Sequence, residues 1–240
     1  MKTTVGDHGS GRYYIVDENK NIKYPSVTTI LSEMTDKSGL DAWKARVGEA
    51  EAERISKFSA NRGTFMHSLH EHFINSKFIY KDEKPLQQAF IKSIAECSTL
   101  TEEELEVGKN LFLNFCNNSD FYDRIGSILY QEEPLWSSKG GGYAGRMDLA
   151  INSIEGNPKI IDFKTSKKPK LEKWIDNYKM QIAAYSIALH ERHGIFPKSC
   201  EIWISCETGE VQLFEMDQKS IKDNFEKFHK KVIEYHEKFH

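Results

Sequence analysis

The segment from Gly142 to Tyr185 constrains the fold of this chain most, because it reads as two strands followed by a helix. Its run 159–165 is apolar and β-branched, which is typical of a buried strand. The run 143–151 precedes it, and Glu-Gly-Asn-Pro at 155–158 separates the two with a strong turn signal. The segment therefore predicts a hairpin that leads into a helix.

Two carboxylates and a lysine are expected on one face of this hairpin. Side chains alternate along a strand, so Asp162 and Lys164 point the same way, with Cα atoms about 6.6 Å apart. Asp148, on the preceding strand, can lie beside Asp162, about 4.8 Å away across the ladder. Oxygen ligands of this kind suit Mg²⁺ or Mn²⁺, which polarise a phosphoryl oxygen and activate a water. The pattern indicates phosphodiester hydrolysis, with Lys164 orienting the water or offsetting charge on the phosphate.

The acidic-x-Lys triplet has little specificity by itself. It also occurs at 18–20, 82–84 and 217–219, in polar, turn-like or helix-start contexts. Only the triplet at 162–164 lies in an apolar strand with a second carboxylate one hairpin upstream. A plain salt bridge between Asp162 and Lys164 is the structural alternative, and the addition of Asp148 and the downstream helix favours the catalytic interpretation.

Two helical segments carry further candidates. Gln181 and Tyr185 share one helix face at i, i+4 spacing, which suits hydrogen bonds to a phosphate or a flipped base, and equally a partly buried face without a catalytic role. Upstream, Gly63, His67 and Glu71 lie on one face of a second predicted helix. The glycine allows close approach to another backbone, and His67 is a candidate nitrogen ligand or phosphate contact. A lone helical histidine is more often structural, so both interpretations stay open.

Charged residues flank the hairpin on both sides. Clustered lysines follow the second strand, beside Trp174, and suit a groove that tracks a nucleic-acid strand, or else a solvated loop. These lysines are Lys167, Lys168, Lys170 and Lys173. Before the glycine-rich stretch 139–142, Glu132 or Glu133 offers a further carboxylate, or else a polar residue of an edge strand.

Composition excludes several classes of protein. With 240 residues and a net charge of -3, the chain is no basic coat protein, so nucleic-acid binding must come from a local groove. Its four cysteines form no CxxC pair and are typical of reduced cytoplasmic thiols. No apolar run is long enough to span a bilayer, the first ten residues lack the apolar core of a signal peptide, and no phosphate-binding GxxxxGK[ST] occurs. We expect a soluble, cytoplasmic protein without a membrane or nucleotide-cofactor role.

The remaining patterns give one domain over 1–240, mainly helical to about 125 and sheet-containing from 126. In the first part we expect a hairpin at 12–24, a helix capped by Ser26, two or three helices over 40–77, and helices at 85–97 and 102–117. In the second part we expect a strand at 126–137, the hairpin described above, a helix over about 171–194, a hairpin over 200–215 and a final helix.

Four motifs together resemble a known family. They are Gly145-x-x-Asp148, Asp162-x-Lys164 and Gln181-x-x-x-Tyr185, preceded by a helical Gly63-x-x-x-His67. This set is similar to the PD-(D/E)XK nuclease superfamily in its RecB-like branch, and within that branch to the mitochondrial genome maintenance exonuclease and related phage exonucleases. The resemblance implies an α/β (α+β) restriction-endonuclease-like core, with a mixed central sheet flanked by helices, and DNA cleavage with Mg²⁺ or Mn²⁺.

The resemblance also assigns roles to residues. Asp148, Asp162 and Lys164 are the implied catalytic residues, and Asp148, Asp162 and His67 the implied metal ligands. It gives Gln181 and Tyr185 the supporting role of the helix motif. Arg62, Lys167, Lys168 and Lys170, from the charged segments around the motifs, are the further DNA-binding candidates. The chain lacks the cysteine spacing of the iron–sulfur members and the helicase of RecB itself, which leaves a free-standing nuclease of a bacterial or phage-infected cytoplasm.

The function expected from the sequence is a DNA exonuclease that prefers single-stranded ends, in replication, recombination or repair, with replication or recombination proteins as possible partners. A double-strand-end exonuclease or a structure-specific endonuclease of the same superfamily is the alternative enzyme. An inactive DNA-binding module is the alternative without chemistry.

Overall fold

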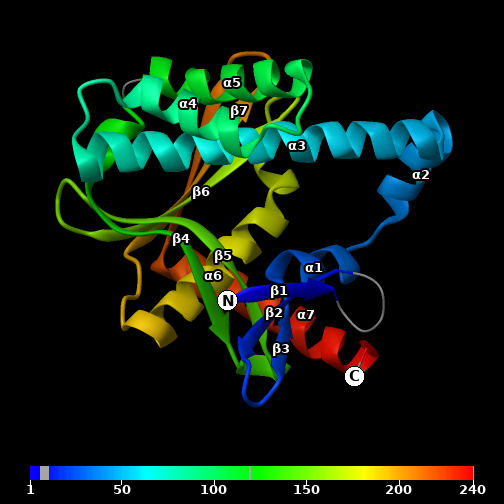
Figure 1. Ribbon diagram of the computed structural model, residues 1–240. Coiled ribbons are helices and arrows are strands. Elements are labelled where there is room, and N and C mark those ends of the chain that lie inside the picture. The colour runs from blue at the N-terminus through cyan, green and yellow to red at the C-terminus, as the bar shows by residue number, and fades with distance from the viewer. Residues whose placement is uncertain (6–10, 119, 240) are drawn as a thin grey trace.

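The computed structural model describes residues 1–5, 11–118 and 120–239, and contains two sheets (Figure 1). A three-stranded antiparallel sheet is formed by β1 (Lys2–Val5), β2 (Arg12–Asp17) and β3 (Ile22–Pro25). A five-stranded sheet has the order β4 (Ile125–Ser137), β5 (Tyr143–Ser153), β6 (Pro158–Ser166), β7 (Ser199–Cys206) and β8 (Val211–Asp217). Its pairs are antiparallel except β6 with β7, which makes the sheet mixed, as the family resemblance implied.

Helices cover both faces of the larger sheet (Figure 1). On one face lie α3 (Glu49–Ile74), which continues into a π-helical turn Asn75–Tyr80, α4 (Pro85–Glu96) and α5 (Glu102–Asn117). On the other face lie α1 (Val27–Glu33), α6 (Asp176–His193) and α7 (Gln218–Phe239). The short helix α2 (Ser38–Val47) precedes α3 and buries none of its residues. Because β6 and β7 are parallel, they need a crossover, and α6 supplies it.

Each face has its own apolar core. Towards α3 and α5, the rings of Phe112, Phe115, Phe163 and Trp203 are almost wholly buried. Towards α6 and α7, the core contains Ile160, Ile182, Ile202 and Phe228. Each fully buried side chain of this size contributes about 1.5–3 kcal/mol relative to exposure. Both faces of the central strands are therefore apolar, which explains the continuous apolar runs in the sequence.

Local signals place the helix starts. The Ser26 side chain accepts a hydrogen bond of 3.0 Å from the Thr29 backbone N–H, and Thr101 with Glu104 forms a capping box at the start of α5. In contrast, α6 begins later than the predicted position near residue 171. The Gln212 side chain bonds both the N–H and the carbonyl of Lys170, at 2.7 and 3.0 Å, and so ties this stretch to β8. A 3₁₀ turn, Glu172–Trp174, then precedes the helix.

The strands β5 and β6 separate at one end, and this separation positions the site. Their ladder runs from the pair Asn152–Pro158 to the pair Leu149–Ile161. Beyond it, the backbone N–H of Phe163 donates to Asp148 Oδ2 at 2.8 Å instead of to a backbone carbonyl. A side chain thus completes the ladder at the point where the sequence placed the catalytic carboxylates.

Among the described residues, no helix combines the length and the apolar character that crossing a bilayer demands.

Candidate active site

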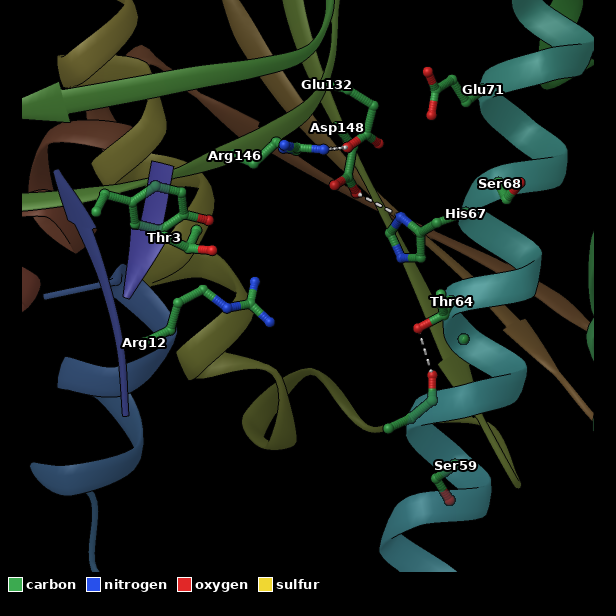
Figure 2. A pocket seen from close by; sticks show the side chains of 13 residues that line it. Thr3, Arg12, Ser59, Thr64, His67, Ser68, Glu71, Glu132, Arg146 and Asp148 are labelled. Atoms are coloured by element: carbon green, nitrogen blue, oxygen red, sulfur yellow. Dashed lines mark hydrogen bonds and ion pairs between the residues drawn. The ribbon is translucent and has the colours of Figure 1, made fainter. Parts of the chain in front are cut away.

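A cleft of about 720 Å³ lies between α3 and the three-stranded sheet (Figure 2). One wall is a helix face of α3, the opposite wall comes from β1 and β2, and the floor comes from β4 and β5. The lining residues are Ser59, Ala60, Gly63, Thr64, His67, Ser68 and Glu71 on α3, Thr3, Arg12 and Tyr14 on the opposite wall, and Glu132, Arg146 and Asp148 on the floor. The predicted helix face of Gly63, His67 and Glu71 is therefore the face that meets the cleft.

Three ligand-type side chains converge in this cleft. His67, Glu132 and Asp148 each offer one atom, and these atoms all lie within 4.8 Å of one another. The Nδ1 atom of His67 is 3.6 Å from Asp148 Oδ2 (Figure 2). Because the three residues come from α3, β4 and β5, the cluster depends on the tertiary fold rather than on any local motif.

Glu132 joins the cluster through an unusual backbone conformation. Its φ is +50°, in the left-handed region that costs a non-glycine residue of order 1 kcal/mol or more. Its neighbours Gln131 and Glu133 pair regularly with Leu149 and Met147 of β5. Glu133 points elsewhere, with its carboxylate 3.0 Å from His193 Nε2. The sequence offered Glu132 and Glu133 as equal candidates for a further carboxylate, and in the structure only Glu132 belongs to the cluster.

Burial controls the charge of the cluster. Burial, the carboxylate of Asp148 and that of Glu71 raise the pKa of Glu132 to about 8, although Arg146, 3.8 Å away, opposes this. Burial also lowers the pKa of His67, so the imidazole is neutral at neutral pH and free to act as a nitrogen ligand. Crowded carboxylates and a neutral imidazole form a donor set that suits a divalent cation.

Asp162 and Lys164 form a buried ion pair behind the cleft floor. Lys164 Nζ lies 2.5 Å from Asp162 Oδ2, and also 5.3 Å from the ring centre of Tyr178 on α6. Asp162 is only 1% exposed, and apart from this ion pair neither carboxylate oxygen has a hydrogen-bond partner among the described residues. Asp162 does not belong to the His67 cluster and does not line the cleft. Because Lys164 holds Oδ2, one buried acceptor atom, Oδ1, is left for a ligand.

Charge interactions link this pair to Asp148. Burial, with the charge of Asp148, raises the pKa of Asp162 to about 7, against the opposing effect of Lys164. Burial acts to lower the pKa of Lys164, but Asp162 and Asp148 outweigh it, so the pKa is raised and the ammonium keeps its proton. Lys164 is therefore a permanent cation that two carboxylates, Asp162 and Asp148, share.

The α6 motif lies against the same site. Tyr185 is 4% exposed and accepts a long hydrogen bond of 3.4 Å from Gln181 Nε2. Burial raises the pKa of Tyr185, and the nearby Asp162 and Asp148 add to the shift. A Cβ at Gly145 would lie 2.6 Å from the Tyr185 ring, so only glycine allows this contact. Packing against Tyr185 therefore requires glycine at position 145. At Gly63 a Cβ would meet only Thr165, at 3.8 Å, so packing does not require glycine there.

The predicted DNA-binding cations lie outside the cleft lining. Arg62 is 5% exposed and pairs with Glu207, in the turn between β7 and β8. Lys167 and Lys168 are exposed in the loop after β6, and Lys170 is half-buried beside Gln212. The cleft arginines, Arg12 and Arg146, were not among the predicted residues. Arg12 comes from a strand far away in sequence, so no local pattern indicates it.

The comparisons with known proteins give the class. The sequence model of the PD-(D/E)XK nuclease superfamily matches residues 40–239. This chain therefore belongs to the PD-(D/E)XK nuclease superfamily. Nucleases of this superfamily act on DNA and generally use divalent metal ions, and the residues here fit such an ion, because His67, Glu132 and Asp148 converge beside the unsatisfied carboxylate of Asp162.

Two solved structures are similar to this chain. The first is named "Putative exonuclease", from Eubacterium rectale, with 12% identity, a TM-score of 0.41, and coverage of 68% of this chain and 64% of that one. The second, SSO0001, has 16% identity, a TM-score of 0.32, and coverage of 69% and 72%. Both likenesses are remote, so membership rests on the superfamily match. None of the curated proteins matches the chain in sequence.

Proposed function

We propose that this protein is a Mg²⁺- or Mn²⁺-dependent DNA exonuclease that prefers single-stranded ends, in replication, recombination or repair. One observation carries the proposal: the buried Asp162, whose Oδ2 pairs with Lys164, has an Oδ1 without a hydrogen bond from the described residues, next to a three-residue ligand cluster. Lys164 is one cation beside two carboxylates, Asp162 and Asp148, and the excess negative charge costs free energy unless a further cation neutralises it. A catalytic metal site explains why the fold keeps it.

Each residue has a separate role in the proposed reaction. Asp148 and Asp162, with His67 and Glu132, would hold the metal, which when bound polarises the phosphoryl oxygen. Lys164, protonated and fixed by Asp162, orients the attacking water or offsets charge that develops on the phosphate. Tyr185 supports the floor through its contact with Gly145, and Gln181 donates a hydrogen bond to the Tyr185 hydroxyl.

The preference for a single strand is supported by an exposed aromatic in the segment between β6, which carries Asp162 and Lys164, and α6, which carries Gln181 and Tyr185. Trp174 is 58% exposed in the 3₁₀ turn between β6 and α6, and Leu171 in the same segment is 52% exposed. Unstacked bases of a single strand gain about 1–3 kcal/mol each by stacking on such rings. Lys167 and Lys168, exposed in the same loop, suit the phosphates of the strand.

We place the protein in the RecB-like branch, near the mitochondrial genome maintenance exonuclease and related phage exonucleases, on the motifs of His67 and of Gln181 with Tyr185. We treat the chain as one nuclease domain with DNA as its partner. The four cysteines are free thiols, which suits a bacterial or phage-infected cytoplasm.

The test uses end-labelled linear single-stranded DNA, linear duplex and circular single-stranded DNA, each with Mg²⁺, Mn²⁺ or EDTA. We expect metal-dependent loss of the linear single strand, and a Lys164→Ala variant that folds but does not cleave. Cleavage of the circle would replace the exonuclease by an endonuclease, and preference for the duplex would move the assignment to a double-strand-end exonuclease. Binding without any cleavage by the native chain would leave a DNA-binding module.

A further inference from the structure

We infer that Arg12 binds a backbone phosphate of the substrate strand, adjacent to the phosphate at the metal cluster, so that the three-stranded sheet forms the second wall of a single-strand channel. This inference rests on the proposed nuclease function and specifies how that site holds its substrate. It assigns a binding role to a residue outside the superfamily motifs described above.

The backbone of Arg12 is fixed by the start of α1. Its N–H donates to Thr29 Oγ1 at 2.9 Å, and its carbonyl accepts from the Ser26 N–H at 2.8 Å. The preceding Gly11 has a φ of +91°, and a Cβ there would lie 2.3 Å from the Thr29 side chain. Arg12 therefore projects from a rigid base, and Figure 2 shows its guanidinium directed across the cleft towards α3.

Arg12 differs from the other arginines around the site. Arg62 pairs with Glu207, and Arg146 lies 3.8 Å from Glu132. Within the part of the chain that the structure describes, the Arg12 guanidinium has no acidic partner, and the residue is exposed. An anchored arginine directed into a cleft without a carboxylate partner is well suited to a phosphate, because its fork of donors binds two phosphate oxygens at once.

The charged side chains divide the cleft into an acidic end and a basic end. Glu71, Glu132 and Asp148 make one end acidic, so a phosphate can approach it only with a cation present. Arg12 makes the other end basic. Between them, the α3 wall consists of small, uncharged side chains: Ser59, Ala60, Gly63 and Thr64. A strand that lies along this wall would place one phosphate at the cation and a neighbouring phosphate at Arg12.

The size of the cleft favours a single strand. A volume of about 720 Å³ is within the range of pockets that enclose one small ligand. A short run of nucleotides fits such a space, whereas a duplex would have to bring its second strand through the three-stranded sheet or α3. The channel thus accounts for strand preference by its shape, with no base-specific contact required.

The experiment measures DNA binding with cleavage switched off. In a Lys164→Ala background, the dissociation constant of a fluorescent single-stranded oligonucleotide is measured by anisotropy with Mg²⁺ at several salt concentrations. Arg12→Ala and Arg12→Lys are compared with Lys20→Ala, which removes one charge from the β2–β3 turn outside the cleft lining. Thermal unfolding of each variant verifies the fold.

We expect Arg12→Ala to weaken binding about tenfold and to reduce the slope of log K against log salt by about 0.7, the value for one phosphate contact on a single strand. The affinity of Arg12→Lys should lie between those of Arg12→Ala and the parent, because lysine keeps the charge but lacks the forked pair of donors. Lys20→Ala should bind as the parent does. In the cleaving protein, Arg12→Ala should raise KM more than it lowers kcat.

Other outcomes would overturn the inference. Equal binding by Arg12→Ala and Lys20→Ala removes the role of Arg12, even where the native chain cleaves DNA as proposed. Tighter binding of duplex than of single strand by the Lys164→Ala protein contradicts the single-strand channel. If the native chain cleaves nothing but Arg12→Ala still loses affinity and salt dependence, the phosphate contact stands and the nuclease proposal fails.

Discussion

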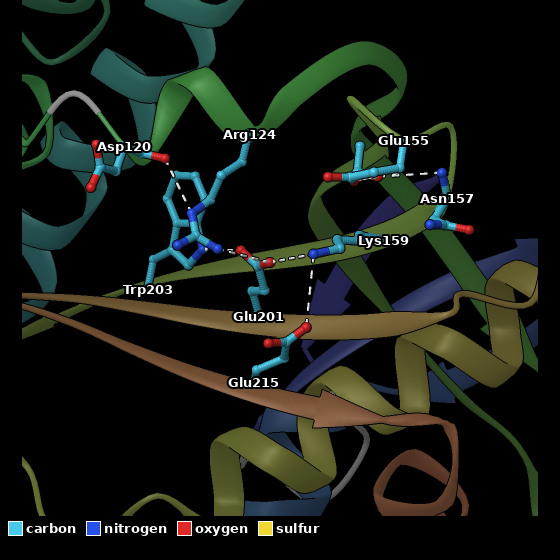
Figure 3. A network of polar contacts seen from close by, with 9 residues as sticks. Asp120, Arg124, Glu155, Asn157, Lys159, Glu201, Trp203 and Glu215 are labelled. Atoms are coloured by element: carbon cyan, nitrogen blue, oxygen red, sulfur yellow. Dashed lines mark hydrogen bonds and ion pairs between the residues drawn. The ribbon is translucent and has the colours of Figure 1, made fainter.

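Two buried carboxylates lie on the neighbouring strands β6 and β7, and the fold treats them in opposite ways. Glu201 is fully buried, accepts hydrogen bonds of 2.8 Å from both Lys159 Nζ and Trp203 Nε1, and has Arg124 at 3.8 Å (Figure 3). Asp162 is 1% exposed and has Lys164 as its ion-pair partner at Oδ2, while Oδ1 accepts no hydrogen bond from the described residues. A carboxylate whose acceptors are satisfied by the protein is structural, and one whose acceptors are left open is available to a ligand.

Exchange of each carboxylate for its amide tests this contrast most strongly. Asp162→Asn should lower the cleavage rate by about 10³, because it removes a metal ligand and the partner that fixes Lys164. It leaves Lys164 without its ion-pair partner, but it also removes a buried charge that is repelled by Asp148, so the loss of stability should be smaller than that of Glu201→Gln. The readouts are single-turnover cleavage and thermal unfolding of the same preparation.

Glu201→Gln should show the reverse. It leaves Lys159 without its buried partner, which costs about 3 kcal/mol, or roughly 6–12 °C in Tm for a chain of this size. Cleavage per folded molecule, measured well below the Tm, should equal that of the native chain. If the amide at 201 abolished cleavage or the amide at 162 unfolded the protein, the division between structural and functional carboxylate would be wrong.

A smaller effect is expected at Glu132. Glu132→Gln should weaken Mn²⁺ binding about tenfold, because it removes one charged ligand of the cluster. Glu133→Gln is the matched control, since its carboxylate faces His193 instead. Calorimetric titration with Mn²⁺ separates the two. An equal loss of Mn²⁺ affinity in both variants would show that the affinity depends on the net charge of the protein and not on ligation by Glu132.

The dependence of stability on pH follows from the same open acceptors. The pKa values of Asp162 and Glu132 are raised in the folded protein, to about 7 and about 8, so the native state binds more protons than the unfolded chain. Stability without metal should therefore fall as the pH rises through these values. Mg²⁺ offsets the loss by pairing with the ionised forms, so its Tm increment should be larger at pH 8.5 than at pH 5.5. An increment that is the same at both pH values, by scanning fluorimetry against EDTA, would contradict the assignment.

The smallest effect is expected at the periphery of the Glu201 network. Arg124 is 44% exposed and 3.8 Å from the Glu201 carboxylate. Arg124→Ala should cost less than about 1 kcal/mol, because exposed ion pairs contribute little. Urea unfolding beside Glu201→Gln measures the difference. A loss as large as that of Glu201→Gln would mean that Arg124, and not Lys159, is the essential partner.

The sequence predicted the parts of the site that local patterns encode. Alternation along a strand placed Asp162 beside Lys164, and the i, i+4 spacing placed Gln181 beside Tyr185. Most helix boundaries also followed from periodicity, caps and turns, whereas the mixed sheet was implied by the family resemblance. These features depend on neighbours within a few residues, so they can be read from one sequence.

Long-range contacts could not be predicted in this way. The register of β4 on β5, and the left-handed backbone of Glu132, decide which of two adjacent glutamates enters the cluster. Arg12 reaches the cleft only because β2 packs where the chain has folded back over β5. Arg62, in the middle of a motif-bearing helix, turns instead to Glu207. The open acceptor of Asp162 appears only in three dimensions.

Titration of the native protein with Mn²⁺, followed by calorimetry and by the paramagnetic signal of the free ion, tests the central claim most directly. Asp148→Asn and Glu201→Gln are measured beside it. We predict saturable binding to the native chain and to Glu201→Gln, and loss of that binding in Asp148→Asn. The absence of saturable binding in the native chain, or equal binding in Asp148→Asn, would contradict a metal centre in this cleft.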